Sequence, residues 1–109
     1  MREILDYLQE HLGREVTAYL SGADDLKAFE LWAQGIMAEA RDLPGMRLRS
    51  AHEAVCALID AYGSPMARAW LFGMNPMLDD EAPAYVLRHS QSPDDWRLVV
   101  DAAQDVVWT

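Results

Sequence analysis

Apolar residues recur at helical spacing along most of the chain, and this pattern restricts the fold more than any other feature. Near the start, Ile4, Leu5, Leu8 and Leu12 fall on one face of a helix. Near the end, the same spacing gives a strong stripe made of Trp96, Val99, Val100, Ala103, Val106 and Val107. No segment alternates apolar and polar residues as a half-buried strand does. The sequence therefore predicts an all-α, compact fold of about six or seven helices.

Glycines divide the first part of this pattern into segments. We expect a first helix that ends at Gly13, a second over 14–20, a tight turn over 21–24, a third helix from Asp24 or Asp25 to Gly35, and a fourth over 47–62. Ile36, Met37 and Ala40 could extend the third helix by a turn. The Asp42-Leu43-Pro44-Gly45 segment predicts a loop.

In the second part, a polar residue precedes a proline at Ser64-Pro65, Asn75-Pro76 and Ser92-Pro93. Such a pair favours a helix start, because a proline in the first turn forgoes no helical hydrogen bond. We expect helices over 65–72, 83–89 and 93–107, a single turn over 76–78, and a capping box of Ser92 with Asp95. The segment over 65–89 holds too few apolar residues to be stable alone. We therefore expect a small core against the last helix, made of Trp70, Leu71, Leu78, Val86 and Leu87.

The chain is acidic, which argues against bulk binding to nucleic acid. Its net charge is −9, divided into −3 over residues 1–50 and −6 over residues 51–109. Neither part would attract a phosphate backbone unless charge is sorted locally. The single cysteine, Cys56, excludes an internal disulfide and suggests a reducing compartment. No apolar run approaches a membrane span, and charges interrupt the first residues where a signal peptide would be apolar, so we expect a cytoplasmic domain.

No residue pattern in the sequence indicates catalysis or metal binding. His52 and Cys56 are one helical turn apart, but no third zinc ligand accompanies them, so we expect Cys56 to be a small buried apolar residue and His52 a surface residue. The acids over 79–81 lack the alternation and the glycine of a calcium loop and are interpreted as acids ahead of the next helix. Phosphate-binding loops and G-x-S-x-G are absent. We expect no enzyme, no metal and no cofactor.

Ala18 and Gly22 have the spacing of a helix-turn-helix, and Trp32 with Gly35 fits the end of its second helix. That second helix has a local charge of −2, from Asp24, Asp25 and Glu30 against Lys27. A DNA-binding regulator is thus the alternative function. Its phosphate contacts would come from Lys27, Arg41, Arg47 and Arg49. The three arginines could equally be a solvated helix start with its loop.

Residues 69–83 carry a family pattern: Trp70-Leu71, then Asn75-Pro76, Leu78 and Pro83. Val86-Leu87-Arg88 and the helix over 93–107 complete it. This pattern resembles the toxin-binding domain of the Xre/MbcA/ParS antitoxin family, and the match covers residues 63–109. Residues 1–62 resemble more loosely the helix-turn-helix half of the same family, from which they depart in the acidic second helix. The chain is thus interpreted as a helix-turn-helix-like region over 1–62 and a toxin-binding region over 63–109.

The resemblance implies an antitoxin that silences a RES-domain toxin, an enzyme that degrades NAD or uses it as an ADP-ribosyl donor. It also implies a homodimer that can repress its own operon, and an antitoxin C-terminus at the toxin's active-site cleft. The toxin-binding residues would be Trp70, Leu71, Asn75, Pro76, Leu78, Pro83, Val86, Leu87, Arg88, Val107, Trp108 and Thr109. Trp108 would enter the cleft as an aromatic anchor. Alternatively, Trp108 folds back onto its own core.

Overall fold

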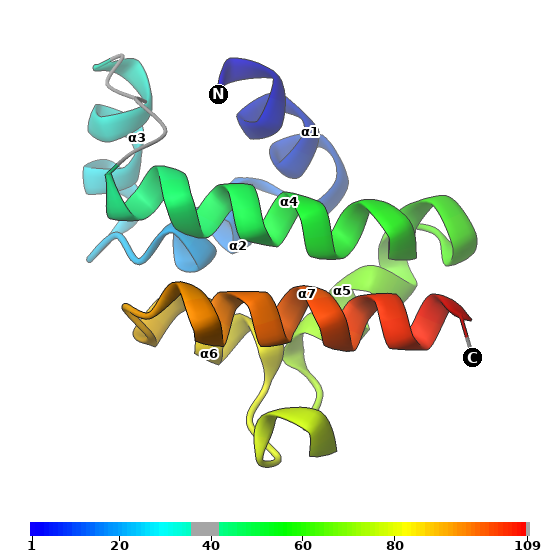
Figure 1. Cartoon of the computed structure of the whole chain (residues 1–109). Helices are drawn as coiled ribbons and strands as arrows, with labels where there is room; N and C mark the ends of the chain where they lie inside the picture. The colour runs from blue at the N-terminus through cyan, green and yellow to red at the C-terminus, as the bar shows by residue number, and fades with distance from the viewer. Residues whose placement is uncertain (36–41, 109) are drawn as a thin grey trace.

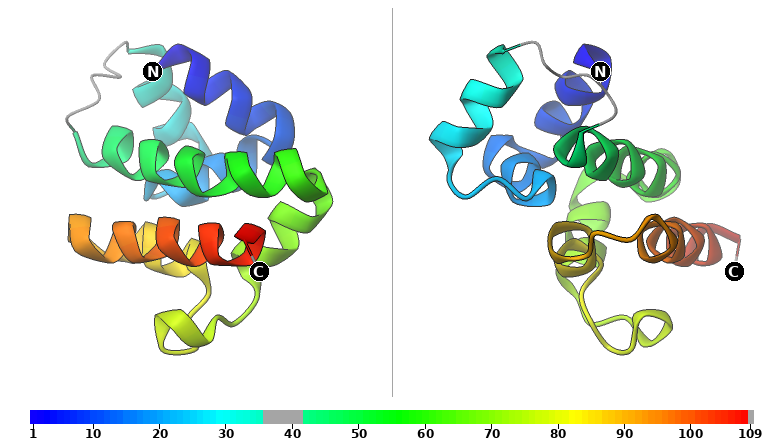
Figure 2. Two further views of the ribbon diagram at one scale, coloured as in Figure 1. Left: turned by 45° about the vertical axis from the view of Figure 1, so that its right-hand side comes forward. Right: turned by 60° about the vertical axis from the view of Figure 1, so that its left-hand side comes forward.

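Helices α4 (Leu43–Tyr62) and α7 (Pro93–Trp108) lie side by side, and the other elements pack around this pair (Figures 1 and 2). The structure is a computed structural model that describes residues 1–35 and 42–108. Expectations for Ile36, Met37, Ala40, Arg41 and Thr109 therefore lie outside the described residues. Across the described ranges the chain is helical with no strand, which confirms the all-α prediction. None of the helices in these ranges is long and apolar enough to span a membrane.

Three helices precede α4: the first two pack on α4, and the third packs on the second. They are α1 (Arg2–Leu12), α2 (Arg14–Ser21) and α3 (Leu26–Gln34). Their boundaries confirm the predicted ones, because Gly13 and Gly22 have positive φ and Asp25 accepts a hydrogen bond from the Ala28 N–H at 2.7 Å. They bury Leu5, Leu8, Leu12, Leu20 and Phe29.

The remaining elements are α5 (Ser64–Phe72), the short 3₁₀ helix η1 (Pro76–Leu78) and α6 (Pro83–His89). Their positions agree with the helices predicted over 65–72, 76–78 and 83–89. Leu71, Leu78 and Leu87 are buried in the same cluster as the core of α1–α4 and α7, and Trp70 and Val86 pack against it partly buried. Residues of both predicted regions therefore share one apolar core.

The loop predicted over 42–45 is wrong, because α4 begins there. Asp42 accepts a hydrogen bond from the Gly45 N–H at 2.9 Å, and Pro44 lies in the first turn, where its missing N–H has no helical partner to lose. Asp42 also accepts a bond from the Trp32 indole at 2.7 Å, which ties the start of α4 to α3. The turn-forming residues are here a helix cap.

Two of the predicted caps also differ. Gly63 is the residue before α5, and the Ser64 side chain instead lies 2.8 Å from a ring nitrogen of His11. At α7, the Ser92 N–H donates to the Ser90 hydroxyl at 3.0 Å, and that hydroxyl donates to Asp95 at 2.7 Å. Ser90 thus stands between the two residues of the expected capping box. The third prediction is confirmed, because Asn75 caps η1.

Candidate partner-binding surface

A hairpin over residues 73–82 projects from the domain between α5 and α6 (Figure 1). The backbone of Asn75 closes the hairpin. Its carbonyl accepts hydrogen bonds from the N–H groups of Leu78 and Asp80, both at 2.9 Å, and its N–H donates to the Glu81 carbonyl at 3.2 Å. Asp79 and Asp80 have φ values of 57° and 65°, in the left-handed region that Asp tolerates better than most residues. The acids over 79–81 lie ahead of α6, as interpreted. Asp79 and Asp80 form the turn of the hairpin, and none of the three acids lies in the first turn of α6.

Asn75 also fixes the hairpin through its side chain, which accepts a hydrogen bond from the Met77 N–H at 2.9 Å. We expect Asn75→Ala to lower the free energy of unfolding by about 1 kcal/mol, the usual cost of a lost cap. Asn75→Asp should lose much less, because its carboxylate can accept the same bond. Urea unfolding of both variants measures the difference, and equal losses would contradict the capping role.

The predicted toxin-binding residues separate into a structural group and an exposed group. Leu71, Leu78, Pro83 and Leu87 are buried, so they shape the surface from beneath. Trp70 is half-buried, and its indole N–H has no hydrogen-bond partner among the described residues. Pro76 is exposed on the hairpin and Val86 is half-buried. The exposed apolar side chains nearby are residues that the sequence pattern did not indicate: Phe72, Met74, Met77, Tyr85 and Leu98.

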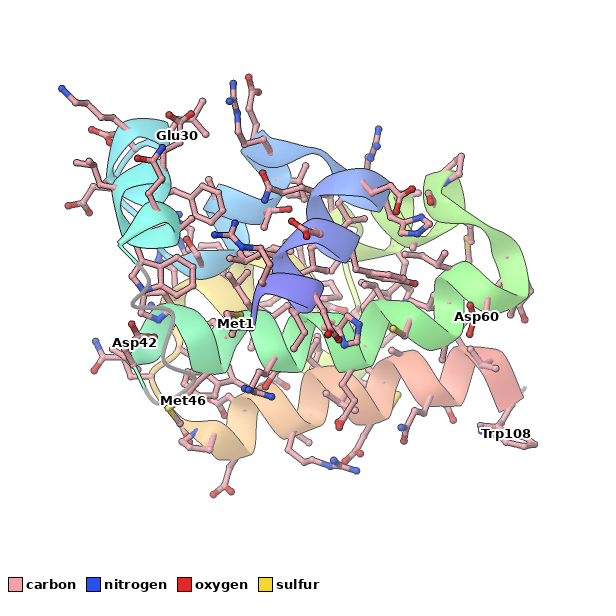
Figure 3. The ribbon with its side chains drawn as sticks, turned by 90° about the horizontal axis from the view of Figure 1, so that it is seen from above. Met1, Glu30, Asp42, Met46, Asp60 and Trp108 are labelled. Atoms are coloured by element: carbon pink, nitrogen blue, oxygen red, sulfur yellow. The ribbon has the colours of Figure 1, made fainter. Side chains whose placement is uncertain are left out.

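Trp108 is 87% exposed at the end of α7, so the alternative in which it folds back onto its own core is wrong (Figure 3). Val107, one residue before it, is partly buried against the core. The Tyr62 hydroxyl donates to the Val106 carbonyl at 3.5 Å and links this end of α7 to the end of α4. An aromatic side chain is thus held outside the domain by a helix whose last turn is anchored through Val106 and Val107.

Arg88, the last of the predicted toxin-binding residues, is used inside the domain. Its guanidinium donates to the carbonyls of Tyr19 and Ala23, both at 2.9 Å, and lies 4.7 Å from the centre of the Tyr19 ring. Arg88 therefore joins α6 to the turn after α2. If Arg88 contributes to partner binding, it does so indirectly, by holding α6 in position.

Arg47, a predicted DNA contact, is buried beside Arg88. It donates to the carbonyls of Ser21 at 3.4 Å and Ser90 at 3.2 Å, which lie at the ends of α2 and α6. These carbonyls carry the partial negative charge of a helix C-terminus, so they replace a carboxylate as the partner of the cation. Burial, and secondly Arg88, lower the pKa of Arg47. Arg47 is therefore not free to contact a phosphate.

Lys27 and Arg49 are exposed, on α3 and α4. Arg14, near α3, is already paired with Glu30 at 3.2 Å. We expect binding of this chain alone to duplex DNA of its own promoter to be weak or absent, because one expected cation is internal and α3 is acidic. Fluorescence anisotropy over a salt series tests this. Tight, salt-sensitive binding that Lys27→Glu with Arg49→Glu abolishes would contradict it.

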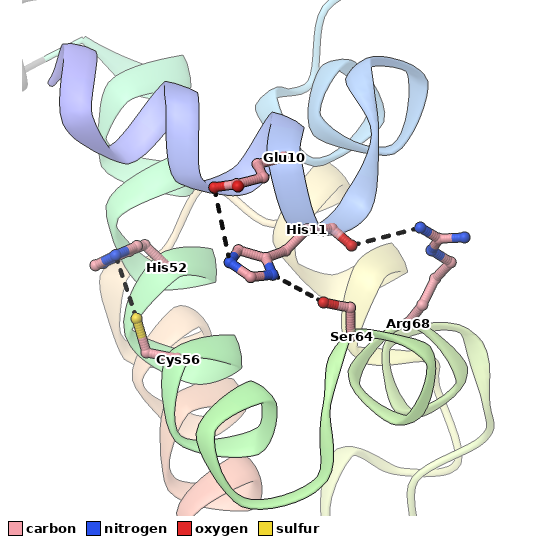
Figure 4. A network of polar contacts seen from close by, with 6 residues as sticks. All are labelled: Glu10, His11, His52, Cys56, Ser64 and Arg68. Carbon is pink, nitrogen blue, oxygen red and sulfur yellow. Dashed lines mark hydrogen bonds and ion pairs between the residues drawn. The ribbon is translucent and has the colours of Figure 1, made fainter.

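A polar network links α1 and α5 (Figure 4). His11 lies 2.8 Å from Ser64 and 4.0 Å from Glu10, and its carbonyl accepts a bond from Arg68 at 3.4 Å. The order Glu–His–Ser resembles a hydrolase triad, but 4.0 Å is too long for the bond that orients a catalytic histidine. The network instead fastens the end of α1 to the start of α5.

Cys56 is only partly buried, so its predicted burial is wrong. Its sulfur lies 3.2 Å from His52 Nε2, and the two rings of Tyr7 and His52 meet edge to face. Burial raises the pKa of Cys56 and lowers that of His52, which favours a neutral thiol with a neutral imidazole. Such a pair is a poor nucleophile. Nowhere in the described ranges do three His, Cys, Asp or Glu residues gather as a metal site would need.

Comparison with known proteins returns nothing above the level of chance: no family model matches the chain, and neither does a curated protein or a solved structure.

Proposed function

We propose that this protein is an antitoxin of a type II toxin–antitoxin system, which binds and neutralises a RES-domain toxin that degrades NAD or transfers ADP-ribose from it. The observation that carries the proposal is the exposed Trp108 at the end of an anchored α7. Tryptophan is among the residues that most often dominate a protein–protein interface, and Trp108 is exposed on a helix that the domain holds in place, which suits it to that role. In this proposal Val107, Trp108 and Thr109 occlude the toxin's active-site cleft.

Charge supports the same partner. An NAD site must hold two phosphates, so it carries cationic groups, and residues 51–109 carry a net charge of −6. The hairpin of Asn75 and Pro76 and the half-buried Trp70 and Val86 would add docking area apart from Val107, Trp108 and Thr109. Arg88, Leu71, Leu78, Pro83 and Leu87 would act by holding that area in shape.

The alternative, a DNA-binding regulator of its own operon, has weaker support. Gly22, in the left-handed conformation, does form a turn between α2 and α3, as a helix-turn-helix requires. However, Arg47 is internal and Asp24, Asp25 and Glu30 flank Lys27. A homodimer is proposed as well, from the resemblance and from exposed apolar residues such as Phe72 and Met74. Sedimentation equilibrium distinguishes it from a monomer.

The test is NAD consumption by the RES-domain toxin encoded beside this chain, measured with increasing amounts of the purified protein. Inhibition that saturates at a fixed stoichiometry supports the proposal. If the full-length chain neither binds that toxin in calorimetry nor slows its NAD consumption, the proposal fails.

A further inference from the structure

A groove of about 300 Å³ lies between the hairpin, α6 and α7. Its apolar lining consists of Met77, Leu78, Tyr85, Val86 and Leu98. Met77, Tyr85 and Leu98 are each about half exposed, although they are large apolar side chains from three different elements. Scattered exposed apolar residues are ordinary, but several that converge on one hollow indicate a contact surface.

The fold accounts for this hollow. Helix α7 turns Trp96, Val99, Val100 and Ala103 into the core, so Leu98 lies off that stripe and faces away from it. The Asn75 bonds lie within the hairpin and fix its shape, and η1 of the hairpin contacts α7. The groove is therefore built by hydrogen-bonded backbone on one side and by a helix on the other.

The rim of the groove is acidic. Asp79, Glu81 and Asp95 line it, and none of the described residues lining it is cationic. The two nearest arginines in sequence are engaged elsewhere. Arg88 binds the carbonyls of Tyr19 and Ala23, and Arg97 pairs with Glu53 at 3.3 Å and Asp101 at 3.2 Å. His89 stacks on the Tyr85 ring with centroids 4.2 Å apart. The carboxylates of Asp79 and Glu81 have no ion-pair partner within the described parts of the chain.

We propose that this groove binds a partner segment that presents one or two large apolar side chains flanked by Lys or Arg. The apolar side chains would cover Met77, Tyr85 and Leu98, and the flanking cations would pair with Asp79, Glu81 and Asp95. A second copy of this chain is a poor occupant, because its net charge of −9 would set carboxylates against carboxylates. The inference rests on the proposed function only for the identity of the partner, which would be the toxin, and not for the chemistry of the groove.

The probe is a synthetic amphipathic peptide of about 18 residues, long enough to be helical, with a leucine stripe and lysine flanks. A matched peptide carries glutamate at every lysine position. Both are titrated into the full-length ¹⁵N-labelled protein at low salt. We expect the lysine peptide to shift the amide signals of 77–86 and 95–98 and to bind about tenfold more tightly than its glutamate counterpart, as expected for two or three partly exposed ion pairs.

Variants separate this groove from general attraction to an acidic protein. Leu98→Ala should weaken lysine-peptide binding, whereas Leu31→Ala, at an exposed leucine on α3, should not. Glu81→Gln should weaken it more than Glu3→Gln, which changes the net charge by the same amount on α1. Equal affinity of the two peptides, shifts centred elsewhere, or equal effects of the paired variants would overturn the inference. So would groove signals that move with protein concentration alone, since the occupant would then be a second copy.

The two proposals can fail separately. A chain that inhibits the toxin but does not discriminate between the peptides loses the groove inference and keeps the proposed function. A chain that binds the lysine peptide in the groove but leaves NAD consumption unchanged keeps the groove inference and loses the antitoxin function.

Discussion

Deletion of residues 107–109 is expected to restore NAD consumption by the toxin while leaving the two proteins bound to each other. Trp108 is the most exposed large apolar side chain among the described residues. It lies at the end of α7, which Figure 1 shows apart from the hairpin. Docking area and cleft occlusion are thus different contacts on different parts of the chain. Removing the plug should free the active site without removing the docking surface.

The expected loss of binding free energy on deletion follows from what a tryptophan buried in an interface contributes to affinity. Truncating such an interface residue commonly costs at least about 2 kcal/mol, or about thirtyfold in the affinity of that contact. Because affinity falls as well, inhibition must be compared with the toxin fully saturated by each form, and saturation is verified by calorimetry. Under that condition the truncated chain should be bound to the toxin and yet inhibit its NAD consumption poorly.

Two controls make the result specific. Trp108→Ala should reproduce most of the effect of the deletion, whereas Leu31→Ala, which removes another exposed apolar side chain from α3, should inhibit normally. Both variants lie at exposed positions, so neither should change the thermal unfolding of the protein by much. If the truncated chain inhibits as well as the full-length chain at matched saturation, occlusion by the C-terminus is excluded and only docking remains.

Helix positions were predictable because glycine, proline and apolar spacing act locally. Gly13, Gly22 and Asp25 set the first boundaries through their own backbone or side-chain geometry. The same local logic failed at 42–45, where an Asp-Leu-Pro-Gly segment suits a turn and a helix start equally. In the structure Asp42 caps α4 and also accepts a hydrogen bond from the indole of Trp32, ten residues away in sequence, a contact that no local pattern indicates.

The surface was less predictable than the fold, since exposure depends on how helices pack. The family-like pattern indicated Leu71, Leu78 and Leu87, which are buried, and did not indicate Met77, Tyr85 or Leu98, which line the groove. Arg47 and Arg88 look like surface cations in sequence. Their internal roles depend on carbonyls of Ser21, Ser90, Tyr19 and Ala23, and no local rule brings those atoms together.

The junction of α2, α4 and α6 should show the largest effect on stability. Gly22 has a φ of 84°, and a methyl group there would overlap Nη1 of Arg47 and lie 3.1 Å from its Cζ atom. Gly22→Ala therefore meets two costs: the left-handed conformation, about 1–2 kcal/mol, and displacement of the guanidinium from the carbonyls of Ser21 and Ser90. We expect a loss of about 3 kcal/mol in the free energy of unfolding.

Arg47→Ala should cost about as much, because it removes two charge-assisted hydrogen bonds and the packing of a buried side chain. The double variant should cost about 2 kcal/mol less than the two single changes added together, since without Arg47 the methyl group at position 22 has nothing to displace. Gly13→Ala is the matched control. Its φ is 92°, but no atom lies within 4 Å of the added methyl group, so its cost should add to that of Arg47→Ala without coupling. Urea unfolding measures two double-mutant cycles, one that combines Arg47→Ala with Gly22→Ala and one that combines it with Gly13→Ala. If the free-energy losses of Gly22→Ala and Arg47→Ala simply add, Arg47 does not hold this junction.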